Sequence, residues 1–450
     1  MTQNILARVL SAPDIPSAFS DEALIAAMLR FEFTLAHCQE RLGLIPSGVA
    51  AVIDQHAREL DLDAAVLVKY ARASGSLVIP LVHSLTASVQ STNPAAARYV
   101  HFGATSQDAI DSALAACTVT AIASIDAASH RAIVAATRLA RNHAADPVLA
   151  RTLLQAAGVT TFGWKFAHAA LALARCRTRL QMTAHHSIAV SLGGPTGSLS
   201  TFGHHGATLR AALAHEMGLA DPGASWHSHR DRWLALATDT ALMVGTAAKI
   251  AGDIALMAQN EVGELSLSNT EGTGRSSAMP HKHNPVAAIR VLAAAQPVPG
   301  IIASLLGGMR QAHERAFGEW QSELAQWSSL FDTAVDATAA LATLLDDLHP
   351  DTTRARVNID AQFGVLFSAT LADRLSAALG RTAAHAMVAT LCANALRDRQ
   401  PLVDVALAMH RYDPRLASIS ATTIEAAFSL DAATATSVRE VEELLAQIQQ

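Results

Sequence analysis

A regular apolar repeat between Asp231 and Glu264 is the feature that most constrains this fold. Positions along this segment recur at alternating spacings of three and four, and they are Trp233, Leu236, Thr240, Met243, Ala247, Ile250, Ile254 and Met257. This spacing places them on one face of an α-helix, whose rise of about 1.5 Å per residue predicts a rod roughly 50 Å long. Such a rod must bury its apolar face against other long helices.

Four further long segments predict helices of the same kind, at about 106–143, 160–189, 286–309 and 319–348. Pro297 and Pro299 predict a kink in the third of these, and Pro350 ends the fourth. We find neither alternating apolar and polar runs joined by hairpin turns nor an internal repeat. The sequence therefore predicts an all-α fold with a central five-helix bundle.

Shorter amphipathic segments flank the predicted bundle. The first runs from Ser20 to Leu42, with Ser20 as its N-cap and Gly43 at its end. Others lie at about 47–60, 63–74 and 80–92 and, beyond Pro350, at about 361–379, 383–399, 402–410, 421–428 and 438–450. We therefore expect three helical domains, which span residues 1–104, 105–350 and 351–450.

The composition indicates a chain that buries much of its surface against copies of itself. Of its 450 residues, 51% are hydrophobic and only 16% are charged, which leaves little polar surface for a monomer of close-packed helices. We therefore expect an oligomer. The net charge of −6, without runs of Lys or Arg, excludes the basic surface of a nucleic-acid-binding protein.

The cysteines and apolar segments indicate the compartment in which the chain works. The four cysteines are far apart and show no Cys-x-x-Cys spacing, so we expect neither a disulfide framework nor a thiolate metal site. Residues 1–20 lack the apolar stretch of a signal peptide, and prolines interrupt the apolar run from Val291 to Leu306. We expect a cytoplasmic protein without a membrane-spanning helix.

The segment from Glu271 to Val286 carries the most chemistry. It reads Glu-Gly-Thr-Gly-Arg-Ser-Ser-Ala-Met-Pro-His-Lys-His-Asn-Pro-Val, and its glycines and prolines exclude a helix interior. Its groups suited to anion binding and proton transfer belong to Ser276, Ser277, His281, Lys282, His283 and Asn284. An ordinary turn between helices is the plain alternative, but the fixed order Ser-Ser-x-Met-Pro-x-Lys-x-Asn-Pro argues against it. We interpret the segment as a movable catalytic loop.

A second polar turn reads His101-Phe-Gly-Ala-Thr-Ser-Gln-Asp108. Gly103 allows a tight turn, and Thr105 or Ser106 can cap the long helix that follows. Their hydroxyl groups would then lie at the positive end of a helix, which favours the binding of carboxylates. His101 either orients substrate or relays a proton, or it is a buried histidine bonded to the backbone.

Two further features are of interest near these motifs. Gly193-Gly-Pro-Thr-Gly-Ser198 faintly resembles a phosphate-binding loop, but it lacks the following lysine, so we interpret it as a turn between helices. Trp320 follows Arg315 closely and is a candidate to line the pocket.

Several motifs together resemble one family. The loop resembles the signature of the fumarase/aspartase superfamily, and most of the chain is similar to its bacterial 3-carboxy-cis,cis-muconate cycloisomerases. The matching segments are His101–Asp108 with Ile110-Asp111, Arg151-Thr-Leu-Leu-Gln155 with Thr161-x-Gly163, Glu261-Val-Gly-Glu264, the loop, and His313-Glu-Arg-Ala-Phe-Gly-Glu-Trp-Gln321. The resemblance implies a homotetramer in which three subunits assemble each active site, and it implies that no cofactor is needed.

Leu153 distinguishes between the reactions of this superfamily. In adenylosuccinate and argininosuccinate lyases, the motif that resembles Arg151-Thr-x-x-Gln155 carries a histidine at the place of Leu153, and this histidine protonates the departing amine. Leucine cannot transfer a proton. A lactonisation needs no acid there, because the group that adds or leaves is a carboxylate with an ordinary pKa of about 4. Leu153 therefore favours a cycloisomerase.

The hypothetical mechanism has two catalytic residues. Ser276 would deliver a proton to carbon, or remove it in the reverse direction, while a substrate carboxylate adds to a diene. A serine hydroxyl is a poor base in water, so Lys282, backbone N–H groups and the exclusion of water would have to lower its pKa. The predicted binding residues for this small tricarboxylate substrate are His101, Thr105, Ser106, Gln155, Ser277, Asn284 and Arg315, the last assigned on its charge and family likeness.

Other interpretations of the same residues remain open. Histidine pairs such as His204-His205 lack Cys, Asp or Glu partners at ligand spacing, so we expect no metal. His283 stands where an arginine is common in the family loop, which bears on substrate choice. The enzymatic alternative is a fumarate-releasing lyase like the adenylosuccinate or argininosuccinate lyases. A catalytically silent structural protein is the alternative from another class.

Overall fold

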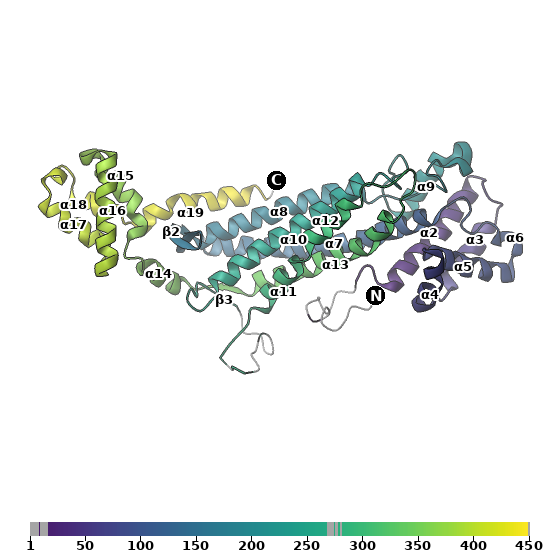
Figure 1. Cartoon of the computed structure of the whole chain (residues 1–450), viewed down its shortest axis with the longest axis horizontal. Coiled ribbons are helices and arrows are strands. Elements are labelled where there is room, and N and C mark those ends of the chain that lie inside the picture. Colours follow the sequence, from purple (N-terminus) through teal and green to yellow (C-terminus); the bar gives the residue numbers. More distant parts are fainter. Residues whose placement is uncertain (1–8, 10–16, 268–273, 275–277, 280, 449–450) are drawn as a thin grey trace. The chain divides into compact units, whose positions relative to one another are not determined.

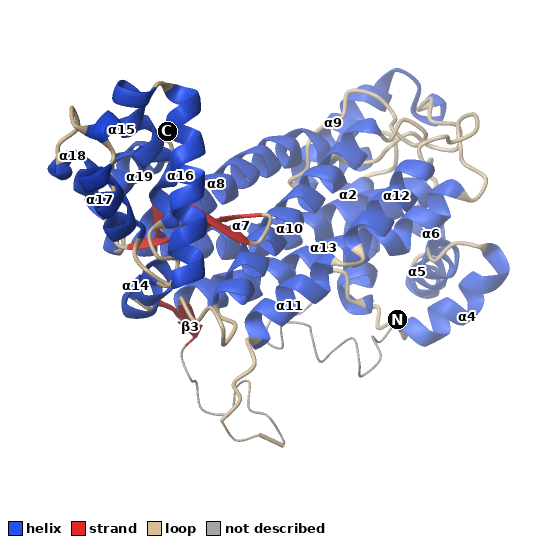
Figure 2. Ribbon diagram, turned by 60° about the vertical axis from the view of Figure 1, so that its left-hand side comes forward, coloured by secondary structure: helices blue, strands red, loops and turns tan. Residues whose placement is uncertain are grey.

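The computed structural model describes residues 9, 17–267, 274, 278–279 and 281–448. Helices dominate the described chain (Figures 1 and 2). Contacts between residues divide it into two compact units. Unit 1 consists of Met1–Ser129, Cys176–Ala248 and Ile289–Ala340, and unit 2 of His130–Arg175, Lys249–Ala288 and Leu341–Gln450. The predicted all-α class is confirmed, whereas the division into three consecutive domains stays a prediction.

Unit 1 begins with short helices whose ends follow from the sequence. They are α2 (Asp21–Arg41), α3 (Val49–Glu59), α4 (Ala64–Ser74), α5 (Val78–Thr92) and α6 (Pro94–Ala97). The Ser20 hydroxyl accepts a hydrogen bond from the backbone N–H of Ala23 at 3.2 Å, so Ser20 caps α2 as predicted. The four predicted helices in this region, α2 to α5, are confirmed.

Some helices contribute residues to both units. They are α7 (Ser106–Asn142), α8 (Phe162–Ser187), α10 (Asp231–Met257), α11 (Val286–Ala295) and α13 (Glu319–Asp346), while α12 (Val298–Gly307) belongs to unit 1. In unit 1 the indole ring of Trp233 on α10 stacks on that of Trp327 on α13, with ring centroids 3.6 Å apart. Both rings are fully buried, so they form part of the core of this unit.

Two of the predicted long helices are shorter than predicted. The helix predicted over 231–264 ends at Met257, and a turn follows in which Gly263 has a φ of +60°. The segment 286–309 forms two helices, α11 and α12, because Pro297 between them has no N–H to donate to a helical hydrogen bond. A further helix in unit 1, α9 (Gly206–Met217), is not predicted from the sequence.

A β-hairpin in unit 2 contradicts the prediction that hairpins are absent. Strand β1 (Pro147–Thr152) pairs antiparallel with β2 (Gln155–Thr161), and β3 (Leu265–Leu267) pairs antiparallel with β4 (Leu348–Pro350). The β1–β2 connection consists of Leu153 and Leu154, which both have positive φ, of 50° and 63°. Such turns normally carry Asn-Gly or Asp-Gly, so two leucines do not signal a hairpin.

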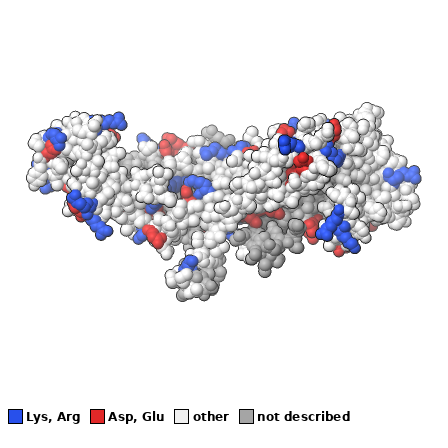
Figure 3. Space-filling model, in the orientation of Figure 1, with Lys and Arg blue, Asp and Glu red and all other residues white. Residues whose placement is uncertain are grey.

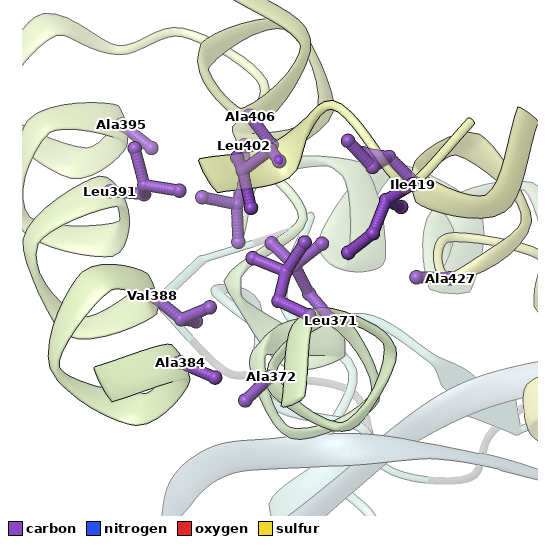
Figure 4. Close-up of a cluster of buried hydrophobic side chains, with 13 residues drawn as sticks. Leu371, Ala372, Ala384, Val388, Leu391, Ala395, Leu402, Ala406, Ile419 and Ala427 are labelled. Atoms are coloured by element: carbon purple, nitrogen blue, oxygen red, sulfur yellow. The ribbon is translucent and has the colours of Figure 1, made fainter. Parts of the chain in front are cut away.

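The C-terminal part of unit 2 contains a helical cluster with its own core (Figure 4). Its helices are α15 (Ser368–Leu379), α16 (Arg381–Asp398), α17 (Leu402–Tyr412) and α18 (Ala421–Ala426), while α14 (Thr352–Asp360) packs against β1 and α19 (Leu430–Ala446) against β2. Leu371, Leu391, Leu402 and Ile424 are buried in this core. The sequence does not predict α14, and it places the starts of α15 and α19 about seven residues too early and eight too late, respectively.

Some long helices are strongly apolar and incompletely covered. By length and composition alone, Ser106–Asn142, Asp231–Met257 and Val286–Gly307 could each cross a membrane, and so could the bent pair α4 and α5 if counted as one span. Only 39% of the apolar window of the second and 22% of that of the third are buried. Charged side chains are scattered over the face in Figure 3, with large uncharged areas between them. The absence of a membrane-spanning helix stays a prediction.

Candidate active site

The polar turn at 101–108 lies at the start of α7 in unit 1. Helix α7 begins at Ser106, so Thr105 and Ser106 lie at its N-terminus, as predicted. Gly103 has a φ of +75°, and a Cβ there would come within 2.4 Å of the ring of Phe202. Because only glycine fits this close approach, Gly103 helps to fix the point at which the helix begins.

Asp108 holds this turn together. Its fully buried carboxylate accepts hydrogen bonds from the backbone N–H groups of Thr105 at 3.0 Å, Gly193 at 2.8 Å and Gly194 at 2.9 Å. The Nε2 atom of His227 lies 2.7 Å from the same carboxylate. Asp108 is not among the predicted site residues, although an acidic residue in the first turn is a known signal for a helix start.

Arg315 lies against the Gly193-Gly194 turn. Its guanidinium group donates hydrogen bonds to the carbonyl oxygens of Pro195 at 2.9 Å and Gly194 at 3.4 Å. Within the described ranges, no ion pair includes Arg315. An arginine held by neutral carbonyl groups keeps its charge for an anionic ligand.

His101 forms a charged pair with Glu32 of α2. The Nδ1 atom of His101 lies 2.7 Å from a carboxylate oxygen of Glu32, whose side chain is fully buried. Burial by itself lowers the pKa of His101, but the charge and hydrogen bond of Glu32 and the charge of Asp108 outweigh it, so the pKa is raised. His101 is therefore paired with a carboxylate instead of the backbone, and its protonated form is favoured.

A buried charge network lies next to this turn, around Asp111 of α7. The guanidinium group of Arg230 donates to Asp111 at 2.8 Å and also pairs with Glu323. The indole N–H of Trp320 donates to Asp111 at 2.9 Å. Trp320 is only 4% exposed and holds Asp111, so its indole N–H serves this network. Burial raises the pKa of Glu323 despite the nearby arginine.

The β1–β2 hairpin in unit 2 presents the motif of Arg151 and Gln155. Arg151 donates two hydrogen bonds of 2.7 Å to the fully buried carboxylate of Glu264, which fixes the base of the turn. Leu153 and Leu154 form its tip and are 96% and 73% exposed. Gln155 is exposed at the start of β2. Two strained, apolar residues are thus displayed on a firmly anchored hairpin.

Of the predicted catalytic loop, the structure describes residues 274, 278–279 and 281–286. Ser276 and Ser277 lie outside the described residues. Lys282 is exposed, and its backbone N–H donates to Met279 at 3.0 Å. The backbone N–H of Asn284 donates to Gly274 at 2.8 Å, which closes the neck of the loop.

The structure therefore brings part of the predicted site together. In unit 1 it gathers His101, Thr105, Ser106 and Arg315 around the carboxylate of Asp108 and the turn at Gly194. Gln155, Lys282 and Asn284 belong to unit 2. Within the described ranges, no group of three His, Cys, Asp or Glu side chains is arranged to hold a metal ion.

Comparison with known proteins decides the family. The lyase family matches residues 10–300, which is more than half of the chain. The chain belongs to the lyase family. The predicted place in the fumarase/aspartase superfamily is confirmed, and the chain is accordingly an enzyme.

Three members of the lyase family are similar over most of their length. A 3-carboxy-cis,cis-muconate cycloisomerase from Bradyrhizobium diazoefficiens is 37% identical, over 89% of each chain. A nitrosuccinate lyase from Streptomyces davaonensis is 36% identical, over 85% of this chain and 82% of that protein. The crystal structure of the 3-carboxy-cis,cis-muconate lactonizing enzyme from Pseudomonas putida superposes with a TM-score of 0.91 at 31% identity and covers 99% of both chains.

Proposed function

We propose that this enzyme interconverts 3-carboxy-cis,cis-muconate and 4-carboxymuconolactone, the cycloisomerisation of the protocatechuate branch of the β-ketoadipate pathway. The observation that carries the proposal is the 37% identity to a cycloisomerase of this name over 89% of both chains. The site adds support, because a polar helix end and an arginine that forms no ion pair with the described residues suit a substrate with several carboxylates.

The reaction needs one new carbon–oxygen bond and one proton on carbon. A carboxylate oxygen of the substrate adds to the diene, and the electron pair of the double bond moves onto the neighbouring carbon, where another carboxylate delocalises it. Ser276 then donates its proton to this carbon and is reprotonated from solvent. Lys282 stabilises the serine alkoxide until it is reprotonated. Because the proton on carbon is replaced from solvent, one proton is consumed for each lactone formed.

Each substrate carboxylate has its own group of residues in this proposal. Ser277, Lys282 and Asn284 bind the first, and Thr105 and Ser106 bind the second at the N-terminus of α7. Arg315 binds the third. His101, with its raised pKa, and Gln155 orient the substrate.

Leu153 supports a cycloisomerase over an amine-releasing lyase. The leucine lies at the tip of the β1–β2 turn, and neither it nor its neighbour Leu154 can carry a proton. The carboxylate that adds or leaves in a lactonisation is ionised at neutral pH and needs no such donor.

A fumarate-releasing lyase is the second candidate, and the 36% identity to a nitrosuccinate lyase favours keeping it. The two functions are separated with purified enzyme. Loss of diene absorbance on addition of carboxymuconate supports the cycloisomerase. Release of fumarate from adenylosuccinate or argininosuccinate, without reaction of carboxymuconate, overturns it. Ser276→Ala should lower turnover by at least about 100-fold, as expected for loss of a general acid and base.

A cytoplasmic homotetramer with shared active sites is also part of the proposal. Its support is the poor coverage of the apolar helices α10 to α12, and the exposure of Leu153 and Leu154, which copies of the chain would bury. The test is to co-express Ser276→Ala with Arg315→Ala. If different subunits contribute the two residues, mixed tetramers regain activity that neither variant has alone. Mixed tetramers as inactive as the parents contradict shared sites.

We also propose the division into three domains. The separate core around Leu371 and Leu402 supports a C-terminal domain at 351–450. Limited proteolysis that releases a stable fragment starting near residue 351 is the expected result, and uniform degradation contradicts it.

A further inference from the structure

Asp108 connects two of the elements to which we assign substrate carboxylates. Its Oδ2 atom accepts hydrogen bonds from the N–H of Thr105 at 3.0 Å and from the N–H of Gly194 at 2.9 Å. Gly194 and Pro195 in turn accept hydrogen bonds from Arg315. One carboxylate oxygen therefore links the N-terminus of α7 to the arginine.

The turn at Gly193 and Gly194 can take this position only because it has no side chains. A Cβ on Gly193 would lie 2.7 Å from the hydroxyl oxygen of Ser225 and 2.8 Å from Cε1 of His227. Gly194 has a φ of +71°, and its Cβ would lie 3.0 Å from the carbonyl oxygen of Gly103. The turn is thus held between His227 and the turn that precedes α7.

His227 supports the other oxygen of the carboxylate. Its Nε2 atom lies 2.7 Å from Oδ1 of Asp108, and its side chain is only 2% exposed. Its Nδ1 atom is buried and has no hydrogen-bond partner among the described residues, so we assign a hydrogen atom to Nε2, which donates to the carboxylate. The backbone carbonyl of His227 also accepts from the side chain of Gln107 at 2.9 Å.

We propose that Asp108 and His227 are a positioning pair that sets the spacing between Thr105 at the helix end and Arg315. The pair touches no substrate in this proposal. It holds both binding elements at one separation, so that the site selects substrates whose carboxylates have a matching separation. This inference rests on the proposed function of the same site.

Asp108→Asn is the first test. The amide keeps the shape of the carboxylate but replaces one acceptor oxygen by an NH₂ group. This group then faces two donors, either the N–H groups of Thr105 and Gly194 or those of Gly193 and His227. We expect KM to rise at least about tenfold, with kcat changed by less than about threefold, because a binding geometry is lost and the proton transfer is kept. An unchanged KM overturns the proposal.

A double-mutant cycle tests whether Asp108 acts through the arginine. Arg315→Lys shortens the side chain and removes the planar guanidinium group whose Nη2 atom donates to both carbonyl oxygens, so it should also raise KM. If Asp108 acts by placing Arg315, the double variant is no worse than the poorer single variant. The matched control is Asp239→Asn, which removes another buried acceptor, bonded to Arg179 and Thr183. In the double variant of Asp239→Asn with Arg315→Lys, the two fold-losses in kcat/KM should multiply. If the losses of Asp108→Asn and Arg315→Lys also multiply, the inference is overturned.

Variants of His227 keep the test decisive if Asp108→Asn does not fold. His227→Gln retains an N–H donor and should keep KM within about threefold of the wild type, whereas His227→Leu should raise it about tenfold. Equal KM values for these two variants overturn the proposal. The cycle is repeated with citrate binding measured by calorimetry. If wild-type enzyme leaves carboxymuconate unchanged, the proposed function fails. In that case the citrate cycle still tests the positioning pair: coupled losses in citrate affinity support the pair, and independent losses reject it.

Discussion

The backbone N–H of Asn284 donates a hydrogen bond to the carbonyl oxygen of Gly274 at 2.8 Å. Gly274 has a φ of +71°, and a Cβ on it would lie 2.5 Å from the carbonyl oxygen of Asn284. The two backbones therefore touch at the neck of the segment 275–283, which carries the proposed base Ser276. Glycine is needed there both for the close contact and for the positive φ.

Gly274→Ala should therefore impair catalysis by forcing the neck open. We expect kcat/KM to fall at least about tenfold, with a stability loss of about 1–2 kcal/mol from the positive φ. Steady-state kinetics and urea unfolding measure the two effects. Gly223→Ala is the matched control, because Gly223 has a φ of +76° and open space around it. It should lose similar stability and keep full activity, and equal activity of the two variants would show that the neck is not needed.

The Glu32–His101 pair should make stability depend on pH near neutrality. Because the pKa of His101 is raised in the folded protein, the pair contributes its full stability below the ordinary histidine pKa of about 6.5. This contribution is lost as pH rises through the raised pKa. Glu32→Gln should thus be less stable than the wild type by about 1–3 kcal/mol at pH 5.5, and the difference should shrink toward pH 8.5.

Urea unfolding of wild type and Glu32→Gln at several pH values checks this prediction. Asp54→Asn is a suitable control, because Asp54 also pairs with a histidine, His37, at 3.0 Å, but the side chain of His37 is 45% exposed. An exposed pair contributes only about 0–1 kcal/mol, so this variant should show little change between pH 6 and 8. A stability difference for Glu32→Gln that grows with rising pH contradicts the assigned pair.

The sequence predicts most of the long helices because their apolar spacing is regular and their ends carry recognisable signals. Ser20, for example, caps α2 where its hydroxyl can reach the next turn. The β1–β2 hairpin is not predicted, because its turn consists of Leu153 and Leu154 and its strands do not alternate clearly in polarity. Tertiary contacts, including that of Arg151 with Glu264, hold this hairpin in place.

The sequence indicates candidate residues for binding substrate, but it does not show which contacts hold them in place. Thr105, Ser106 and Arg315 stand in recognisable motifs, and the structure brings their segments together. Asp108 belongs to the same motif, but its partners Gly193 and His227 lie 85 and 119 positions away in the sequence. No local spacing connects residues so distant, and only the folded chain shows that they meet.

Asp332 gives a second dependence of stability on pH. Burial raises its pKa to about 6, although the hydroxyl of Ser17 donates to the carboxylate at 2.9 Å and lowers it somewhat. Because this raised pKa favours the neutral acid in the folded state, the contribution to stability is full below about 4 and is lost as pH rises through about 6.

Asp332→Asn should remove this dependence, since an amide stays neutral at every pH. We expect the variant to exceed the wild type in stability by about 1–2 kcal/mol at pH 7.5 and to match it near pH 4. Urea unfolding at the two pH values tests this expectation. The exposed Asp61→Asn serves as the control and should leave the pH profile unchanged. A variant of Asp332 that is less stable than the wild type at pH 7.5 would refute the raised pKa of Asp332.

The two leucines of the β1–β2 turn should lower the stability of the protein while they support its activity. Leu153 and Leu154 have φ values of 50° and 63°, which leucine adopts only at a cost of about 1–2 kcal/mol each, whereas Asn and Gly adopt them readily. The double variant Leu153→Asn with Leu154→Gly should therefore be more stable by about 1–2 kcal/mol. Its turnover of carboxymuconate should fall at least about tenfold, because we place Leu153 in the active site of an assembled tetramer.

Thermal unfolding and steady-state kinetics on the same preparation measure both effects. Arg399→Gly is the matched control, since Arg399 has a φ of 52° at the end of α16, in the C-terminal helical cluster. It should gain a similar stability and keep full activity. If the double leucine variant gains stability without losing activity, the leucines are dispensable for catalysis and Leu153 lies outside the active site. If it instead loses stability, contacts of the leucines within the tetramer outweigh their backbone strain, and the residual activity of the intact fraction then decides their role.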